Sequence, residues 1–305
     1  MPGPSSPTIR TFQPTDADAL TALLRTSLAS GEQAGHTTGD VESIIESFSA
    51  LRHLLVAELG DEPVGLISPI HRFIVVRPDT RRRGIGRALV DAAEADSAQS
   101  PDGPVILLPP HNSALALSFL RAIDFQYDHS LWRFQLDPKR YEPLPTLPTD
   151  LDLTTYTDND LVEYVELINT VFLDHPVPLH VTREQIEHVH TAPNFDAANV
   201  ALIRTQSDEM VGFCVTGTDR SDDTVVGTIS LLGVQREFRG RGLGRFLLVW
   251  GIERLRSTGF EHIELGVEAE NEQAVRLYRS VGFDPVEEWP QWMRTPSARD
   301  RVAAP

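Results

Sequence analysis

The chain contains two copies of one sequence pattern. Residues 73–90 read FIVVRPDTRRRGIGRALV, and residues 231–248 read LLGVQREFRGRGLGRFLL. Each segment is a short apolar run, a polar turn, the pattern Arg-x-x-Gly-x-Gly and an apolar stretch with helical periodicity. Arg81 and Arg239, which open the two glycine patterns, stand 158 positions apart in a chain of 305 residues. A repeat of this length indicates two copies of one folding unit.

Other segments recur in the same order around these two. Residues 112–125, NSALALSFLRAIDF, resemble residues 271–283, NEQAVRLYRSVGF, near the end of each half. The remaining pairs predict first, second and third strands at residues 8–12 and 151–156, 53–58 and 200–204, and 63–67 and 209–215. An Asp-capped helix is expected after each first strand. Two β-α-β-β-α-β units account for the whole pattern.

A proline-rich segment separates the two copies. Residues 137–150 read DPKRYEPLPTLPTD, and their four prolines favour extended backbone that can continue neither a helix nor a central strand. We therefore predict an N-terminal domain at residues 1–137, a linker at 138–150, a C-terminal domain at 151–296 and a tail at 297–305. The alternative is a surface loop within one domain.

The composition excludes several classes of partner. With 27 basic and 44 acidic residues, the net charge is −17, which argues against nucleic acid and anionic membranes and mildly favours a cationic substrate. No apolar run has the roughly 18 residues of a membrane helix, and the first residues do not read as a secretory signal. The single cysteine, Cys214, cannot form an internal disulfide. A cytoplasmic protein is expected.

The glycine pattern of the second half lies between a strand ending at Val234 and a helix expected over residues 243–257. Glycines let backbone N–H groups converge on one point, and a helix start adds positive partial charge, so the loop can hold a phosphate. A plain tight turn is the alternative. A dinucleotide-binding fold is excluded, because its glycines follow the first strand of the domain and not the fourth.

These motifs together resemble the GNAT superfamily of N-acetyltransferases. The second half carries the resemblance in GVQREFRGRGLGRFLL and ELGVEAENEQAVRLYRSVGF, and the tandem layout is most similar to the mycothiol-synthase-like acetyltransferases. The resemblance implies an α+β fold of two tandem GNAT domains. Each would have a mixed, mostly antiparallel central sheet flanked by helices in α/β/α layers.

The resemblance also implies where acetyl-CoA, the cosubstrate, would bind. Its pyrophosphate would lie on the glycine loop, its pantetheine arm between the fourth and fifth strands, and its thioester carbonyl against the N–H of Leu232 or Val234. The implied residues are Leu232, Gly233, Val234, Arg239, Gly240, Arg241, Gly242, Leu243, Gly244, Arg245 and Asn271. Asn271 would contact the arm or only cap the last helix.

The first half has an intact glycine loop of its own. The corresponding residues are Val76, Arg81, Arg82, Arg83, Gly84, Ile85 and Gly86. They would either bind a second CoA or have a purely structural role.

Tyr278 is the implied catalytic residue, a general acid that protonates the departing thiolate; a core tyrosine is the alternative. In the first half the matching position is Phe119 when aligned from Asn112, or Leu120 when aligned from Phe125. Neither has a hydroxyl. The hairpin there is also short, with 11 positions from Gly65 to Val76 against 22 from Gly212 to Val234. We therefore expect a degenerate first copy and a catalytic second copy.

The general base is not evident from the sequence. Thr228 occupies the position where the resemblance implies a glutamate, and threonine cannot serve as a base. Nearby carboxylates that could act through water, or could simply be solvated, are Asp222, Asp223, Glu264 and Glu268. Four histidines (His175, His180, His188 and His190) either contact the acceptor or lie at the surface.

No metal site is expected. Cys214 is expected to be buried and structural, and Trp289 and Trp292 would close the pocket or pack. The expected activity is transfer of an acetyl group from acetyl-CoA to a primary amine of a small molecule, catalysed by the second half. The alternatives are a non-catalytic CoA-binding sensor or scaffold, and acetylation of a protein or peptide. The acceptor, the acyl length and the oligomeric state stay open.

Overall fold

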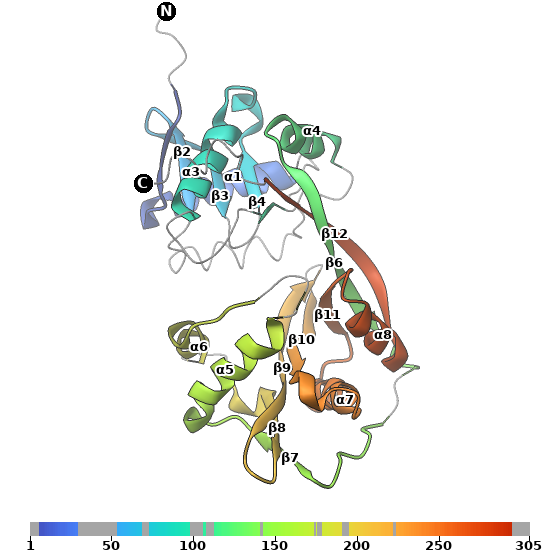
Figure 1. Ribbon diagram of the computed structural model, residues 1–305. Helices are drawn as coiled ribbons and strands as arrows, with labels where there is room; N and C mark the ends of the chain where they lie inside the picture. Colours follow the sequence, from blue (N-terminus) through green and yellow to red (C-terminus); the bar gives the residue numbers. More distant parts are fainter. Residues whose placement is uncertain are drawn as a thin grey trace, which may run out of the picture. The chain divides into compact units, whose positions relative to one another are not determined.

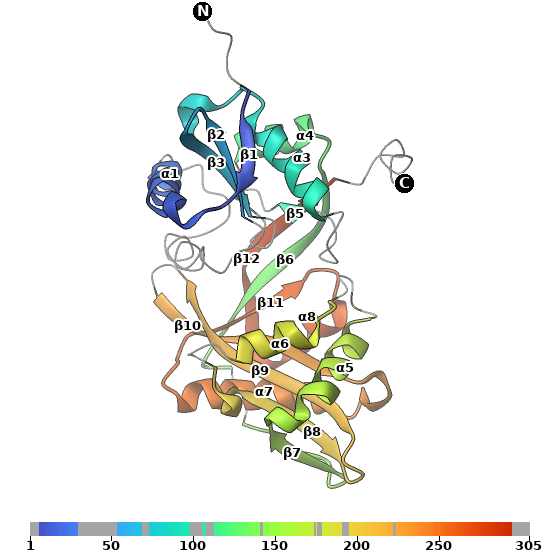
Figure 2. The same cartoon turned by 90° about the vertical axis from the view of Figure 1, so that its left-hand side faces the viewer.

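The computed structural model forms two compact units (Figures 1 and 2). It describes residues 6–29, 54–68, 73–97, 106–107, 113–140, 143–173, 175, 179–190, 195–221 and 224–294. The first unit consists of Met1–Ser130, Ser221–Thr224 and Trp289–Pro305, and the second of Leu131–Arg220 and Val225–Glu288. The division falls after residue 130 and not in the proline-rich segment 138–150, which belongs to the second unit. The predicted tail, Asn112, Asp222 and Asp223 lie outside the described residues.

The first unit contains an antiparallel sheet in the order β1 (Thr8–Thr11), β2 (Leu55–Leu59), β3 (Glu62–Ser68) and β4 (Phe73–Val76). Side chains alternate between its faces, as in any strand. Phe73 and Val75 pack in the core with α1 (Ala17–Ala29), whereas Leu55 and Ala57 pack with α3 (Ile85–Ser97). The sheet therefore lies between helices.

The first unit is completed by the end of the chain. Its short strand β5 (Ile106–Leu107) pairs antiparallel with the end of β12 (Phe283–Met293), and α4 (Ala114–Ala122) follows β5. Arg294 then forms ion pairs with two residues of α3, with Asp91 at 2.8 Å and with Glu94. The last strand of the sequence thus belongs in part to the first unit.

The second unit contains the larger sheet. Its order is β7 (Leu151–Thr155), β8 (Val200–Thr205), β9 (Met210–Ser221), β10 (Thr224–Val234), β11 (Ile263–Glu268) and β6 (Gln126–Leu136), followed by β12. The pairs β7–β8, β8–β9 and β11–β6 are antiparallel, and β10–β11 is parallel. The predicted mixed, mostly antiparallel sheet is confirmed.

Two helical layers enclose this sheet (Figure 2). Helices α5 (Leu161–Phe172) and α6 (Arg183–His190) pack on one face, in a core with Leu202 and Phe213. Helix α7 (Leu243–Ser257) and helix α8 (Glu272–Val281) pack on the other, where Leu265 and Val267 of β11 are buried. The layered α+β architecture is therefore as predicted.

Short 3-10 turns precede several of these elements, at Pro14–Asp16, Pro78–Thr80, Asp158–Asp160, Ala197–Asn199 and Arg236–Phe238. In the described part of the chain, no helix combines the length and the apolar character needed to cross a membrane.

Candidate active site

A cavity of about 480 Å³ lies in the second unit, between the last residues of β10 and β11 and the first turns of α7 and α8. Most of the residues predicted to bind a ligand in the second half line it. These are Leu232, Gly233, Val234, Arg239, Gly240, Gly242, Leu243, Gly244, Arg245, Asn271 and Tyr278. Residues far apart in the sequence are therefore brought together around one cavity.

The cavity exists because β10 and β11 separate. They pair in parallel at Gly227 with Ile263, at Thr228 with Glu264 and at Ile229 with Leu265. No further pair forms between the described residues of these strands, and the residues that follow the last pair, 230–234 and 266–268, line the cavity. Separated strands present backbone N–H and C=O groups that an extended, peptide-like chain can bond.

An irregularity in β10 coincides with this separation. Ile229 and Val234 pack in the core beneath α7 and Leu232 packs against it, whereas Leu231 packs in the core beneath α5. Strict alternation would place Ile229 and Leu231 on the same face. One residue is therefore inserted between Ile229 and Leu232, as in a β-bulge. Because a bulge bends its strand, it gives a local reason for β10 to leave β11.

The glycine loop has the backbone that an anion cradle needs. Gly240 and Gly242 have φ of 76° and 81°, and a Cβ at either would meet no atom within 4 Å. Glycine is thus required there for its backbone conformation and not for lack of space. Gly242 also precedes the first turn of α7, whose free N–H groups carry positive partial charge.

The arginines of this loop have different partners. Arg239 Nε donates to the Val234 carbonyl at 3.1 Å, and Arg245 Nη1 donates to Ser280 Oγ at 3.0 Å. Arg241 Nη2 instead bonds both carboxylate oxygens of Asp150 at 2.7 Å, and this bond lowers the pKa of Asp150. Arg241 is not among the residues that line the cavity.

Tyr278 packs in the hydrophobic core and also lines the cavity. Its ring lies 6.4 Å from that of Phe134 and 6.3 Å from that of Phe283, and it is only 8% exposed. Burial, with a smaller effect of Cys214, raises its pKa above the ordinary value, so the hydroxyl is protonated at neutral pH. A general acid must be in that state.

Asn271 caps α8 and also contacts a histidine. Its Oδ1 accepts the N–H of Ala274 at 3.1 Å, and its Nδ2 lies 3.2 Å from His175 Nε2. Because the cap occupies the amide oxygen, the amide presents its NH2 group to the ring. The Nε2 atom is then placed to accept that hydrogen bond.

The nearby carboxylates have different surroundings. Glu264 accepts from Arg133 Nη1 at 2.6 Å, and Arg133 Nε donates to Glu287 at 3.0 Å. Neither Glu264 nor Thr228 lines the cavity, because both lie where β10 and β11 are still paired. Glu268, at the open end of β11, does line it and is 8% exposed.

The other three histidines considered as acceptor contacts do not line the cavity. His190 stacks on Phe195 at 4.1 Å and contacts Tyr156 at 4.5 Å, and burial lowers its pKa. His180 and His188 are exposed. Within the described ranges no group of three or more His, Cys, Asp and Glu side chains is placed to hold a metal ion. Cys214 is buried beneath α7, as predicted, and burial raises the pKa of its thiol.

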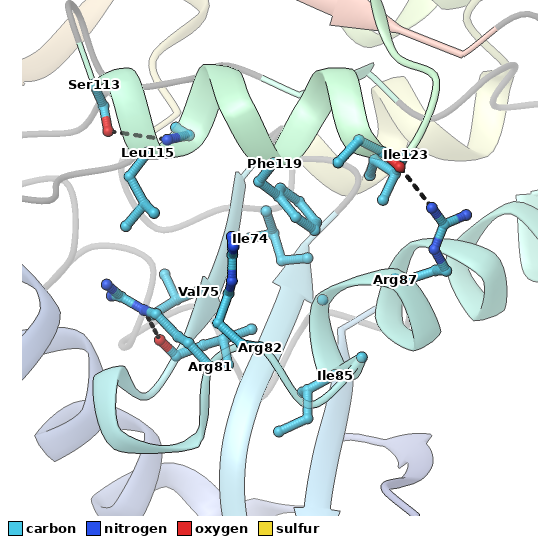
Figure 3. Close-up of a pocket in the computed structure, with 15 residues that line it drawn as sticks. Ile74, Val75, Arg81, Arg82, Ile85, Arg87, Ser113, Leu115, Phe119 and Ile123 are labelled. Atoms are coloured by element: carbon cyan, nitrogen blue, oxygen red, sulfur yellow. Dashed lines mark hydrogen bonds between the residues drawn. The ribbon is translucent and has the colours of Figure 1, made fainter.

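The first unit has a cavity of about 310 Å³ at the corresponding place (Figure 3). Of the residues predicted there, Val76, Arg81, Arg82, Gly84, Ile85 and Gly86 line it, and Arg83 does not. The loop repeats the backbone of the second copy, with φ of 65° at Arg82 and 80° at Gly84. Leu115 and Phe119 project toward the loop from α4, so the wall is apolar.

Equivalent contacts settle which residue replaces the tyrosine. In the first unit Arg81 Nε donates to the Val76 carbonyl at 3.0 Å, as Arg239 does to Val234. Ser113 caps α4 through the N–H of Ala116, as Asn271 does through Ala274. In each comparison the equivalent residues of the two units are 158 positions apart in the sequence. At this offset the counterpart of Tyr278 is Leu120, while Phe119 matches Leu277.

The packing of those two side chains agrees with this alignment. A Cβ on Gly86 would lie 2.8 Å from the Phe119 ring, and one on Gly244 would lie 3.3 Å from Leu277. The predicted shortening of the hairpin is also present, since β4 has 4 residues and β10 has 11.

Sequence reasoning missed the part of the wall that comes from α5. Val171 and Phe172 line the cavity, and a Cβ on Gly233 would lie 2.6 Å from Val171 Cγ1. Gly233 is thus needed for the approach of α5, a contact between residues distant in the sequence. Trp292 does not line the cavity; it packs in the first unit, edge-on to Tyr127 at 6.5 Å.

Comparisons with known proteins point to one family. The family model described as "Acetyltransferase (GNAT) family" matches residues 161–283, and "Acetyltransferase (GNAT) domain" matches residues 50–127. The mycothiol acetyltransferase of Clavibacter michiganensis subsp. michiganensis is 33% identical over 218 residues, covering 70% of this chain and 69% of the relative. That of Thermobispora bispora is 33% identical over 245 residues, covering 77% and 81%.

Solved structures share the fold. A GCN5-related N-acetyltransferase from Sphaerobacter thermophilus aligns with a TM-score of 0.66 at 22% identity, covering 95% of both chains. A tandem GNAT protein from the clavulanic acid biosynthesis pathway aligns with a TM-score of 0.63 at 18% identity, covering 95% of this chain and 99% of that one.

Proposed function

This chain belongs to the GNAT family of acetyltransferases, and from that premise we propose that its second half acetylates a primary amine of a small molecule, using acetyl-CoA. Family membership makes it an acyl-CoA-dependent N-acetyltransferase. The assignment to the second half rests on one observation. Separated strands, a glycine cradle and a buried tyrosine meet there in one cavity.

The residues present fit acetyl-CoA, which supplies an activated acetyl thioester. Open space beside Gly240 and Gly242 and the start of α7 suit a pyrophosphate, with Arg239 and Arg245 in the same wall. The gap between β10 and β11 suits the peptide-like pantetheine arm. In this proposal the backbone N–H of Leu232 or Val234 holds the thioester carbonyl and stabilises its developing negative charge.

Tyr278 is proposed as the general acid. Tyr278 lies in the cavity wall and its hydroxyl is protonated at neutral pH, so in this proposal it gives its proton to the leaving sulfur. The first unit has Leu120 at this position, so we propose that it does not catalyse transfer.

The small-molecule acceptor is suggested by relatives named mycothiol acetyltransferase. At the position where the resemblance implies a glutamate base, this chain has Thr228, which does not line the cavity. A carboxylate that takes the proton of the amine must therefore come from another position.

Turnover of acetyl-CoA tests the proposal. Release of free CoA thiol is measured with deacetylated mycothiol, glucosamine, cysteine and a lysine peptide as acceptors. Tyr278→Phe should lower kcat by about 100-fold or more, with CoA affinity unchanged, because it removes the acidic hydroxyl and little volume. Because burial raises the pKa of Tyr278, loss of its proton should not reduce the wild-type rate between about pH 7 and 9.

Tyr156→Phe is the matched control, since Tyr156 is buried in the same unit outside the cavity; it should retain the wild-type rate. Tight CoA binding without turnover of any acceptor would favour a sensor or scaffold. Turnover of the peptide alone would favour a protein acetyltransferase.

A further inference from the structure

Among the described residues, one carboxylate lines the cavity, and we infer that it is the general base: Glu268 takes the proton that the acceptor amine must lose. This inference rests on the proposed acetyl transfer. Amide formation needs a base, since the nitrogen gives up a proton as it bonds to the acyl carbon.

The other ionisable groups among the described residues of the cavity wall are less suited to take that proton. The guanidinium groups of Arg239 and Arg245 donate hydrogen bonds and have no acceptor atom. Tyr278 keeps its proton, because burial raises its pKa. The Nε2 atom of His175 faces the NH2 group of Asn271 at 3.2 Å, so that contact already occupies it. Glu268 is left among the described residues that line the cavity.

The two carboxylates of β11 differ in where they lie along the strand. Glu264 lies beside Thr228 in the paired part of β11 and is bonded to Arg133 at 2.6 Å. Glu268 lies beyond the last pair, where β11 has left β10. The structure therefore distinguishes two residues that the sequence leaves equivalent.

Glu268 and Tyr278 reach the cavity from opposite faces of the sheet. Leu265 and Val267 are buried beneath α7 and α8, so alternation along β11 places the Glu268 side chain on the other face, which α5 and α6 cover. Tyr278 comes from α8 itself. An amine and a departing sulfur occupy different sides of the acyl carbon, so this arrangement gives each its own proton-transfer group.

The step balances as follows. The neutral amine nitrogen forms a bond to the thioester carbon, the carbon–sulfur bond breaks, and Glu268 takes one proton from the nitrogen. The sulfur leaves with the bonding electron pair and takes one proton from Tyr278. Solvent then carries a proton from Glu268 back to Tyr278, and the products are the amide and free CoA thiol.

The test compares Glu268→Gln with Glu270→Gln, using acetyl-CoA and whichever acceptor the wild type acetylates fastest. Glu270 stands two residues further along, is exposed and does not line the cavity. Glu268→Gln should lower kcat by about 100-fold or more with CoA affinity unchanged, and Glu270→Gln should match the wild type. Raising the pH should restore part of the Glu268→Gln rate, because more amine is then neutral.

Rescue distinguishes a base from a packing residue. Sodium formate should restore activity to Glu268→Ala by supplying a carboxylate, whereas equal sodium chloride should not. A wild-type rate in Glu268→Gln, or a loss that neither formate nor high pH relieves, would overturn the assignment alone. No turnover by the wild type with any acceptor would overturn the proposed function and this inference together.

Discussion

Arg82 and Gly240 show how one backbone conformation is occupied by different residues in the two copies. Arg82 has φ of 65° and Gly240 has φ of 76°. Only glycine adopts this region without steric cost, which is about 1–2 kcal/mol for other residues. The first loop therefore keeps the cradle geometry in spite of an unfavourable residue. Strain of this kind persists where the surrounding contacts hold the backbone in place, as the bond from Arg81 to Val76 does.

Exchanging these two residues gives a matched pair of stability predictions. Arg82→Gly should raise the free energy of unfolding by up to about 1 kcal/mol, the relief of strain less the greater chain entropy of glycine. Gly240→Arg should lower it by about 1 kcal/mol. Urea unfolding of both variants and the wild type measures the change. Equal shifts of the same sign would contradict the assigned conformations.

Among the elements, α8 connects the site most directly to the fold. Asn271 begins the helix, and Tyr278 lies about two turns further along. The amide of Asn271 also bonds His175, from the segment after α5. One side chain therefore caps the helix that presents Tyr278 and also contacts a wall residue from another part of the chain.

The cap and the histidine contact can be separated by substitution. Asn271→Ala should lower the free energy of unfolding by about 1 kcal/mol, because it removes the acceptor for the Ala274 N–H. Asn271→Asp keeps that acceptor and adds a charge that the helix start favours, so it should be close to wild type in stability.

The aspartate variant loses the donor to His175. Its acetylation rate should therefore fall although its stability does not, which combined unfolding and turnover measurements would show. Equal stability of the alanine and aspartate variants would contradict the capping role.

At the scale of the whole molecule, the two copies have kept the same scaffold and diverged in chemistry. Both have a glycine loop with two positive φ values and a cavity beside it. The second copy has a long β10, a separated β11 and a tyrosine. The first has a β4 of 4 residues, an apolar wall and Leu120. We therefore expect one strong CoA site, at residues 239–244.

Calorimetric titration with CoA tests this division of labour. Gly242→Val should weaken the strong site by at least about tenfold, because a β-branched residue cannot take φ of 81° without strain. Gly84→Val makes the same change at the equivalent position and should leave that site intact. Circular dichroism checks that both variants are folded. Two sites of equal affinity in the wild type would contradict the expectation.

The sequence alone did not predict where the two units begin and end. Local composition places a boundary in the proline-rich segment, yet β6 continues past residue 130 and pairs with β11 in the second unit. The end of β12 pairs with β5 in the first unit. Periodicity predicts that a strand forms, but hydrogen bonding with distant residues decides which sheet it joins.

The sequence by itself determined the repeat, the order of elements, the glycine loops and the position of Tyr278, because each depends on residues that are neighbours along the chain. The tertiary structure decided what depends on contacts between distant segments. It placed the Arg241 side chain on Asp150 and outside the cavity, aligned Leu120 with Tyr278, and paired Glu264 with Arg133 while leaving Glu268 in the cavity wall. Backbone conformation is a local preference, but the partner of a charged side chain is set by the packing of the whole domain.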